Sequence, residues 1–195
     1  MMEFEKKVLL SQREYHFLLK RKQDAPPRIV QINHYYDTDD FAWNRLGITC
    51  RVRERKGRFE ATIKAHRSSA GECSIETSRP ADNERDARLF DAMGVRLQGC
   101  LTTYRTQLAH WKGLDIVLDE NAYLGRTDYE LEIEYDALRA AQADLALHSI
   151  AFDLHRHHLI EDQEEWCQRA QAVQSKSERF FARKAQLQHA GGAAV

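Results

Sequence analysis

The amino-acid sequence predicts an α+β fold, namely an eight-stranded antiparallel β-barrel forming a tunnel with a charged lumen and helices packed on the outside. An observed pattern and a physical argument together predict this fold. Eight segments alternate charged or polar residues with apolar ones, as strands with two unlike faces do. Closing such strands into a barrel removes the sheet edges and leaves the apolar faces outside for helices to cover. The lumen must then stay wet and hold both signs of charge, since unpaired buried charges are costly.

The first segment, residues 3–10, shows this alternation and already carries candidate chemistry. One face holds Glu3, Glu5 and Lys7, while the other is mainly apolar. Two carboxylates can bind a divalent cation and a lysine can bind an anion, and together they suit a metal-bound polyphosphate. For this segment alone an ordinary solvated strand face is the competing interpretation, because charged alternation is common in antiparallel sheets.

A hairpin in the middle of the chain repeats the pattern. Lys56-Gly57 is typical of a two-residue loop between the strands at 49–55 and 58–64. The register that such a loop imposes gives both strands the same charged face. It places Arg53 opposite Glu60, Arg51 opposite Thr62 and Thr49 opposite Lys64.

The remaining elements follow from the same periodicities. Ser11 is expected to cap a helix that reaches about residue 23, with Glu14 completing a capping box. The densest charged face belongs to residues 128–135, where three glutamates point the same way and repel one another unless cations lie among them. The other expected strands are 29–37, 72–76, 101–110 and 114–119, and the other expected helices are 82–93, 136–148 and 161–172.

Composition limits the domain count and the classes of function. A chain of 195 residues with 43% hydrophobic content can bury one core, so we expect one domain over 1–180 and a partly disordered tail over 181–195. Lys and Arg total 29 against 30 Asp and Glu, and this balance argues against general nucleic-acid or membrane-surface binding. There is no long apolar run or signal segment, and the four cysteines lack CxxC spacing, which favours a cytoplasmic protein without a membrane partner.

The ordered set of charged blocks resembles the CYTH superfamily, also called the triphosphate tunnel metalloenzymes, over about residues 1–180. The first block, Glu3-x-Glu5-x-Lys7, matches the ExExK signature of that family. The later blocks follow in the expected order: Asn33-His34-Tyr35-Tyr36-Asp37-Thr38, Arg51-Val52-Arg53-Glu54, Thr62-Ile63-Lys64, Glu76, Arg105, Asp119, Glu132-Ile133-Glu134 and Ser175-Lys176-Ser177.

The resemblance implies a role for each charged position. Substrate phosphates would be bound by Lys7, Arg51, Arg53, Lys64, Arg105 and Lys176. Mg²⁺ or Mn²⁺ would be held by Glu3, Glu5 and a pair drawn from Glu130, Glu132 and Glu134, of which we favour Glu132 and Glu134. Lys7, Arg53 and Glu132 are the expected catalytic residues. Glu76 and Asp119 would support the ligands from behind or pair with cations.

The expected function is metal-dependent hydrolysis of a triphosphate compound, whether inorganic triphosphate, thiamine triphosphate or a nucleoside triphosphate. A class IV adenylyl cyclase and a non-catalytic module that binds polyphosphate or nucleotide are the alternatives. The chain carries candidate metal-binding carboxylates together with candidate phosphate-binding cations. This combination favours catalysis, because a protein that only binds the ligand does not need to position a water molecule for attack. The sequence does not identify which triphosphate is the substrate, and it does not decide whether the protein forms a homodimer.

Overall fold

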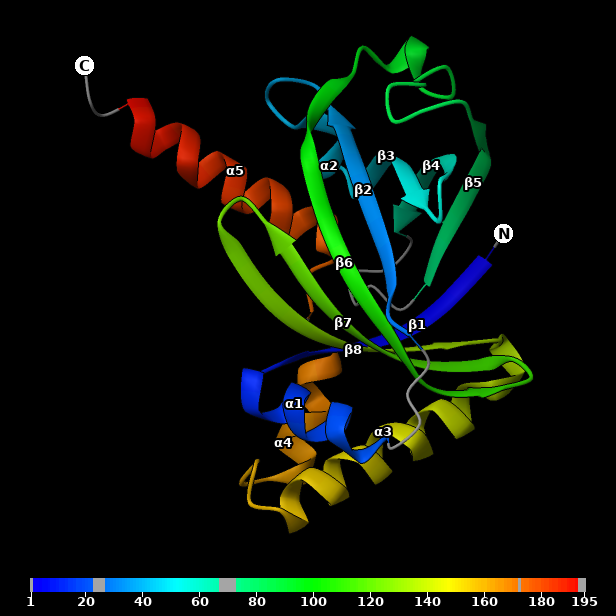
Figure 1. Ribbon diagram of the computed structural model, residues 1–195, viewed down its shortest axis with the longest axis vertical. Helices are drawn as coiled ribbons and strands as arrows, with labels where there is room; N and C mark the ends of the chain where they lie inside the picture. Colours follow the sequence, from blue (N-terminus) through cyan, green and yellow to red (C-terminus); the bar gives the residue numbers. More distant parts are fainter. Residues whose placement is uncertain (1, 23–26, 67–72, 172, 193–195) are drawn as a thin grey trace.

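The computed structural model describes residues 2–22, 27–66, 73–171 and 173–192, and its eight strands close into one antiparallel barrel (Figure 1). The strands follow the order β1-β5-β4-β3-β2-β6-β7-β8 around the barrel, and β8 pairs with β1. The predicted eight-stranded barrel with outer helices is therefore confirmed. Its strands are β1 (Met2–Leu10), β2 (Ile29–Asp37), β3 (Ile48–Arg55), β4 (Arg58–His66), β5 (Cys73–Ala81), β6 (Arg96–Trp111), β7 (Leu114–Tyr123) and β8 (Arg126–Tyr135).

The β3–β4 hairpin has the register that its loop predicts. Arg53 pairs with Glu60 and Arg51 with Thr62. Lys56 has φ 51°, and the next residue, glycine, has φ 70°, as a two-residue hairpin turn of the mirror-image type requires. Because side chains alternate along a strand, this register turns both arginines into the barrel.

The described residues contain five α-helices, and the first begins at the predicted capping box. Ser11 Oγ accepts the backbone N–H of Glu14 at 3.3 Å, and the Glu14 carboxylate accepts that of Ser11 at 2.5 Å. None of these helices combines the length and the apolar character that crossing a bilayer requires. The helices are α1 (Gln12–Arg21), α2 (Ala42–Arg45), α3 (Ala140–Arg156), α4 (Gln163–Gln168) and α5 (Lys176–Gly192).

The helix expected over residues 82–93 does not form, and only a short 3-10 turn (Asp91–Met93) is present there. Local side-chain hydrogen bonds compete with the helix. The Asp86 carboxylate accepts the backbone N–H of Asp82 at 2.9 Å, and Asn83 Oδ1 accepts that of the residue two positions later at 2.9 Å. Helical periodicity alone did not reveal that these turn-forming side chains cap their own backbone.

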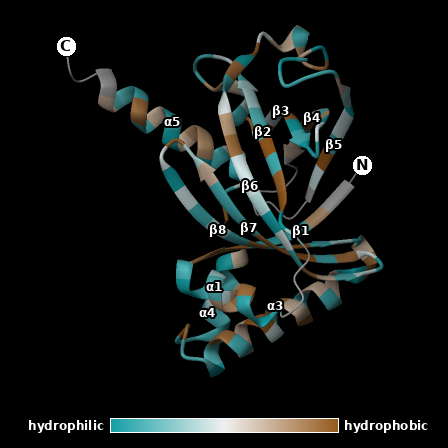
Figure 2. Cartoon of the chain, viewed as in Figure 1, coloured by the Kyte–Doolittle hydropathy of each residue, from teal (hydrophilic) through white to brown (hydrophobic). Residues whose placement is uncertain are grey.

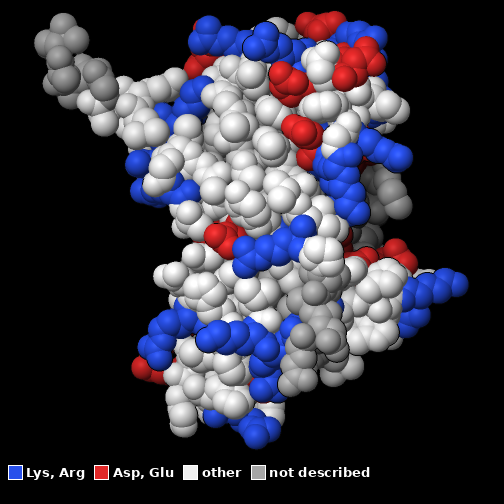
Figure 3. Space-filling view, in the orientation of Figure 1, with Lys and Arg blue, Asp and Glu red and all other residues white. Residues whose placement is uncertain are grey.

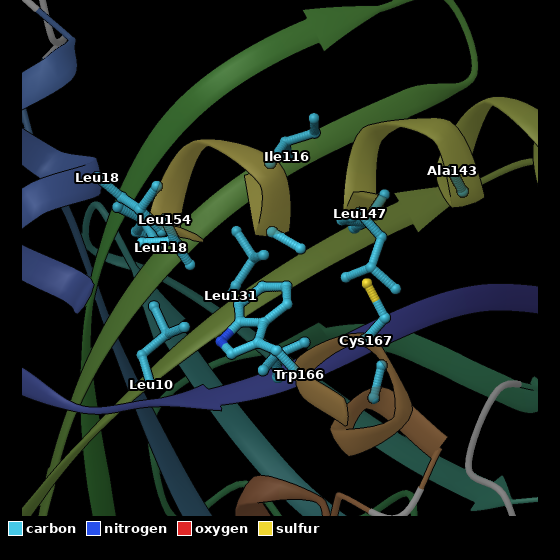
Figure 4. Packing of buried hydrophobic residues seen from close by; sticks show 14 of the residues in the cluster. Leu10, Leu18, Ile116, Leu118, Leu131, Ala143, Leu147, Leu154, Trp166 and Cys167 are labelled. Carbon is cyan, nitrogen blue, oxygen red and sulfur yellow. The ribbon is translucent and has the colours of Figure 1, made fainter. Parts of the chain in front are cut away.

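One apolar core lies outside the barrel, where α1, α3 and α4 cover β1, β7 and β8 (Figures 1 and 4). Figure 2 shows hydrophobic and hydrophilic residues mixed along the strands that these helices cover. Trp166 of α4 is buried within this core, which also contains Leu131 and Leu118 (Figure 4). Its Nε1–H donates to Glu14 Oε1 at 2.8 Å, so the capping glutamate of α1 also satisfies the one polar atom of the indole.

A second apolar core joins α5 to the barrel. Phe180 and Phe181 pack with Tyr35, and the rings of Tyr35 and Phe180 lie 5.1 Å apart. Gly99 of β6 permits this approach, because its φ is 143° and a Cβ there would meet Phe180 at 3.0 Å. The domain boundary expected at residue 180 falls inside α5, which continues to Gly192 and projects from the barrel (Figure 1).

The outer surface carries charges of both signs. On the face in Figure 3, Lys and Arg side chains lie among Asp and Glu side chains and broad uncharged areas. Exposed pairs such as Arg88–Asp82 and Arg45–Asp40, each at 2.6 Å, contribute little to stability because solvent screens them. The charges with larger energetic consequences are those inside the barrel.

Candidate functional site

The barrel encloses a cavity of about 410 Å³ whose wall is mostly charged. Inward-facing side chains of the strands form most of this wall, and the first turn of α5 reaches in from one end. The structure brings most of the sequence-predicted site residues together here. Those lining the cavity are Glu5, Lys7, Arg51, Arg53, Lys64, Glu76, Arg105, Asp119, Glu132, Glu134 and Lys176.

One wall is basic and is formed by Arg51 and Arg53 on β3. Arg53 Nε donates to Asn33 Oδ1 at 3.1 Å, and Arg51 Nη2 lies 3.5 Å from Glu76 Oε2. Within the described residues, no carboxylate forms an ion pair with the Arg53 guanidinium. Burial, together with the like charges of Arg51 and Arg105, lowers the pKa of Arg53 to about 10. An anion in the cavity would relieve this unfavourable charge.

A second wall is acidic and is formed where β1 meets β8. Glu5 pairs in register with Glu134, and Lys7 pairs with Glu132. Lys7 Nζ lies 2.8 Å from Glu5 Oε1 and 3.7 Å from Glu132 Oε1, while Lys64 Nζ lies 3.3 Å from Glu5 Oε1. Burial alone would raise the pKa of Glu5, but Lys7 and Lys64 outweigh it and lower that pKa to about 2.

Glu134 differs from its two acidic neighbours in its titration. Burial, with repulsion from Glu132 and Glu5, raises the pKa of Glu134 although Arg105 opposes the shift. For Glu132, the cations Lys176, Arg105 and Lys7 outweigh burial and hold the pKa well below the ordinary value. Burial and the neighbouring carboxylates therefore disfavour the ionised form of Glu134 more than its ion pair with Arg105 favours it.

Arg105 and Lys176 are already paired with carboxylates, unlike Arg53. Arg105 donates to both oxygens of Asp119, at 2.9 and 2.7 Å, to Glu134 Oε1 at 2.8 Å and to Glu132. Lys176 Nζ lies 2.6 Å from Glu132 Oε1 and 2.9 Å from Asp119 Oδ2. The structure therefore places both residues in the cavity wall, where they bridge the acids of β7 and β8.

The structure separates the three glutamates of β8. Glu132 and Glu134 line the cavity, whereas Glu130 is fully buried behind the wall, in contact with Lys176 and Arg179 of α5. All three share one strand face, but α5 fills the end of the barrel that Glu130 faces. The side chain of Glu3 lies outside the described part of the chain, so its expected metal role stays a prediction.

Residues 1–154 match the family model described as the CYTH domain. The chain belongs to the CYTH family. A Bacillus subtilis (strain 168) protein named "Putative triphosphatase YjbK" is 30% identical over 149 residues, which cover 68% of this chain and 76% of that protein.

Solved structures share the CYTH fold. A Bacillus halodurans structure described as a "putative adenylate cyclase" superposes with a TM-score of 0.67 and 24% identity, covering 92% of this chain and 97% of that one. A Hippeastrum protein described as a "putative adenylyl cyclase" with a dominant triphosphatase activity gives a TM-score of 0.58 and 19% identity, covering 83% and 99%. At these identities the likeness extends to the fold alone.

Sequence reasoning assigned no role to several neutral side chains of this CYTH cavity. Thr49 Oγ1 and Ser177 Oγ lie 2.7 Å apart, and Ser177 Oγ lies 3.0 Å from Ser175 Oγ. Ser175 Oγ accepts the N–H of Glu178 at 3.3 Å, and its own N–H donates to the Glu178 carboxylate at 2.6 Å. The Ser-x-x-Glu spacing is a capping-box signal, so the start of α5 was readable from the sequence. The other lining residues without an assigned role include Gln31, Thr103, Arg55, Asp115 and Asp136.

The CYTH block around residues 33–38 is partly structural. Asn33 lines the cavity and binds Arg53, but Asp37 points elsewhere and is 1% exposed. Its carboxylate accepts the backbone N–H groups of Trp43 at 3.1 Å and Asn44 at 2.8 Å, which belong to α2. A carboxylate at a helix start satisfies N–H groups that have no partner within the helix. The block therefore joins a cavity residue to a helix cap.

The donor set of the acidic wall suits Mg²⁺ or Mn²⁺, because both prefer carboxylate oxygens. Glu5, Glu132 and Glu134 are adjacent on paired strands, and their mutual repulsion favours a cation among them. Among the residues searched, no three His, Cys, Asp or Glu side chains already converge on one point. Lys7 and Arg105 stand between the carboxylates in this conformation, so metal binding would require these pairs to loosen.

Proposed function

We propose that this CYTH protein is a divalent-metal-dependent hydrolase of triphosphate compounds. One observation carries the proposal: Arg53 faces the cavity beside Arg51 without a carboxylate partner among the described residues, while Glu5, Glu132 and Glu134 line the same cavity. A polyanion that arrives with a divalent cation satisfies both walls at once. The name of the Bacillus subtilis relative supports the same reaction class.

The side chains divide the work between phosphate and metal. Arg51 and Arg53 would each donate two N–H groups to phosphate oxygens, which suits the forked guanidinium. Glu5, Glu132 and Glu134 would hold Mg²⁺ or Mn²⁺, which when bound neutralises developing charge and activates water for attack on phosphorus. Lys7 lies between the carboxylates of Glu5 and Glu132 and would orient them for this task.

The size of the cavity limits the substrate. Small-molecule sites commonly occupy about 300–1,000 Å³, and the cavity of about 410 Å³ lies near the lower end of that range. Its lining is dominated by charged and polar residues, so the triphosphate itself would make most of the contacts. A substrate without an organic group therefore remains acceptable.

A cytoplasmic location and a homodimer stay predictions.

The proposal is tested by incubating purified protein with inorganic triphosphate, thiamine triphosphate and nucleoside triphosphates in turn, with Mg²⁺ or Mn²⁺. We expect orthophosphate release from at least one of them and its complete loss with a chelator. Restoring excess Mg²⁺ must restore the rate. Tight triphosphate binding by calorimetry without turnover of any compound would instead identify a non-catalytic binding module.

A further inference from the structure

The first turn of α5 carries two cations that serve different carboxylates. Lys176 and Arg179 are three residues apart, so they lie on the same side of the helix, toward β7 and β8. Lys176 bridges Asp119 and Glu132 in the cavity wall. Arg179 lies one turn deeper and is only 8% exposed.

Arg179 binds two acids of β8 behind the cavity. Its Nε donates to Asp128 Oδ2 at 3.0 Å, and its Nη2 donates to Asp128 Oδ1 at 3.3 Å and to Glu130 Oε2. Nη1 donates to the backbone carbonyl of Gln174 at 2.5 Å, just before the helix starts. One guanidinium therefore ties the beginning of α5 to the barrel strand that carries the acidic wall.

The two acids are themselves held in place. Asn121 Nδ2 donates to Asp128 Oδ1 at 3.0 Å, and Tyr123 Oη donates to Asp128 Oδ2 at 2.8 Å. Thr103 of the cavity lining donates to Asn121 Oδ1 at 2.8 Å. Arg179 thus binds a carboxylate that other barrel side chains also hold.

Glu130 determines what happens when Arg179 is removed. It is fully buried, and its Oε2 lies 3.4 Å from Lys176 Nζ. Without Arg179, Lys176 is the one cation within ion-pair distance of Glu130 among the described residues, and a buried carboxylate is costly to leave unpaired. Lys176 would then be drawn away from Glu132 and out of the cavity wall.

We propose that Arg179 is a positioning residue for catalysis, which fixes Lys176 against Glu132 by neutralising Glu130 and anchoring the start of α5. This inference rests on the proposed function for its kinetic readout. Arg179 itself does not line the cavity, so it acts on the reaction only through Lys176 and the carboxylates that Lys176 contacts.

The test is a double-mutant cycle that combines Arg179→Met with Lys176→Met, assayed with the best triphosphate and Mg²⁺. We expect Arg179→Met to lower kcat/KM by about tenfold or more, and the double variant to be no slower than Lys176→Met alone, because Arg179 acts through Lys176. Arg179→Lys, which keeps the charge but not the fork, should recover part of the loss. Arg183→Met removes an arginine one turn further along α5 and serves as the matched control, with an unchanged rate expected.

Two results would overturn the inference: losses that multiply in the double variant, or a wild-type rate for Arg179→Met. Should Arg179→Met fail to fold, Arg179→Lys carries the same cycle. Hydrogen exchange provides a readout independent of turnover. Amides 176–181 should exchange faster in Arg179→Met than in wild type, while those of α3 do not change. If the wild type hydrolyses nothing, the proposed function fails, and unchanged exchange in α5 would separately reject the anchoring by Arg179.

Discussion

Arg53 is held in the cavity by a neutral partner, Asn33, whose Oδ1 accepts its Nε–H at 3.1 Å. A partly buried guanidinium that pairs with an amide and not with a carboxylate keeps its charge available for a ligand. We therefore expect Arg53→Ala to preserve the fold and lower triphosphate turnover by about 10²-fold, which corresponds to roughly 3 kcal/mol of lost electrostatic stabilisation. Steady-state phosphate release measures this loss.

The matched control for Arg53→Ala is Arg58→Ala in the same hairpin. Arg58 is exposed and does not line the cavity, so its replacement should leave the rate within about twofold of wild type. Circular dichroism and thermal unfolding of both variants check that the barrel is intact. Equal rates for the two variants would show that the basic wall does not contact the substrate.

The strand faces were readable from the sequence because side chains alternate with a period of two. That period put the hairpin in its correct register and gathered Arg51, Arg53 and Glu132 in one lumen. The period alone does not distinguish Glu130, which shares the strand face of Glu132 but lies behind the cavity wall. Only the docking of α5, a contact between residues about 50 positions apart, decides which of the two is accessible.

The same limit explains why Arg179 received no role. Its neighbours in the sequence, Phe180 and Phe181, indicate a buried helix face, but nothing local pairs an arginine with Asp128 and Glu130. The missing helix at 82–93 shows the converse case, in which short polar side chains override helical periodicity. Long-range ion pairs and local side-chain caps are the two features that periodicity does not report.

A metal role for the accessible glutamates can be separated from the role of Glu130. Glu134→Gln removes a candidate ligand from the cavity wall, so we expect the Mg²⁺ concentration for half-maximal rate to rise by about tenfold or more. Glu130→Gln should leave that concentration unchanged, because Glu130 has no access to the cavity. Rates measured over a Mg²⁺ titration decide between them. A larger shift for Glu130→Gln than for Glu134→Gln would reassign the metal ligands.

Glu5 makes folding stability depend on pH in the acid range. Its pKa falls from 4.5 to about 2 on folding, so its ionised form stabilises the native state above pH 4.5 and this stability is lost as the pH falls toward 2. The contribution at neutral pH is about 3 kcal/mol. Glu5→Gln should therefore be less stable than wild type at pH 7 but lose less stability on acidification.

Denaturant unfolding of both proteins from pH 7 to pH 3 measures this difference. The exposed Glu161 of the loop before α4 provides the control, since Glu161→Gln should follow the wild-type curve. Parallel stability curves for Glu5→Gln and wild type would contradict the ion pairs of Glu5 with Lys7 and Lys64.

The products formed from ATP separate hydrolysis from cyclisation. Cyclisation needs the ribose 3′ oxygen to attack the α-phosphate, so the nucleoside must enter the site and a base must reach that hydroxyl. Hydrolysis needs only the terminal phosphate beside an activated water. The lining of the cavity is mostly charged, and its best-placed donors, Arg51 and Arg53, suit phosphate oxygens and not an adenine edge.

We therefore expect ATP, where it is used, to give ADP and orthophosphate with little cyclic AMP, and inorganic triphosphate to be at least as good a substrate. Chromatography of the products after incubation with ATP and Mn²⁺ measures both. Arg53→Ala provides the control, since it should reduce whichever product arises in the barrel. Cyclic AMP and pyrophosphate as the main products would reject the hydrolase and identify a cyclase, because those products require the nucleoside to lie inside a cavity of about 410 Å³.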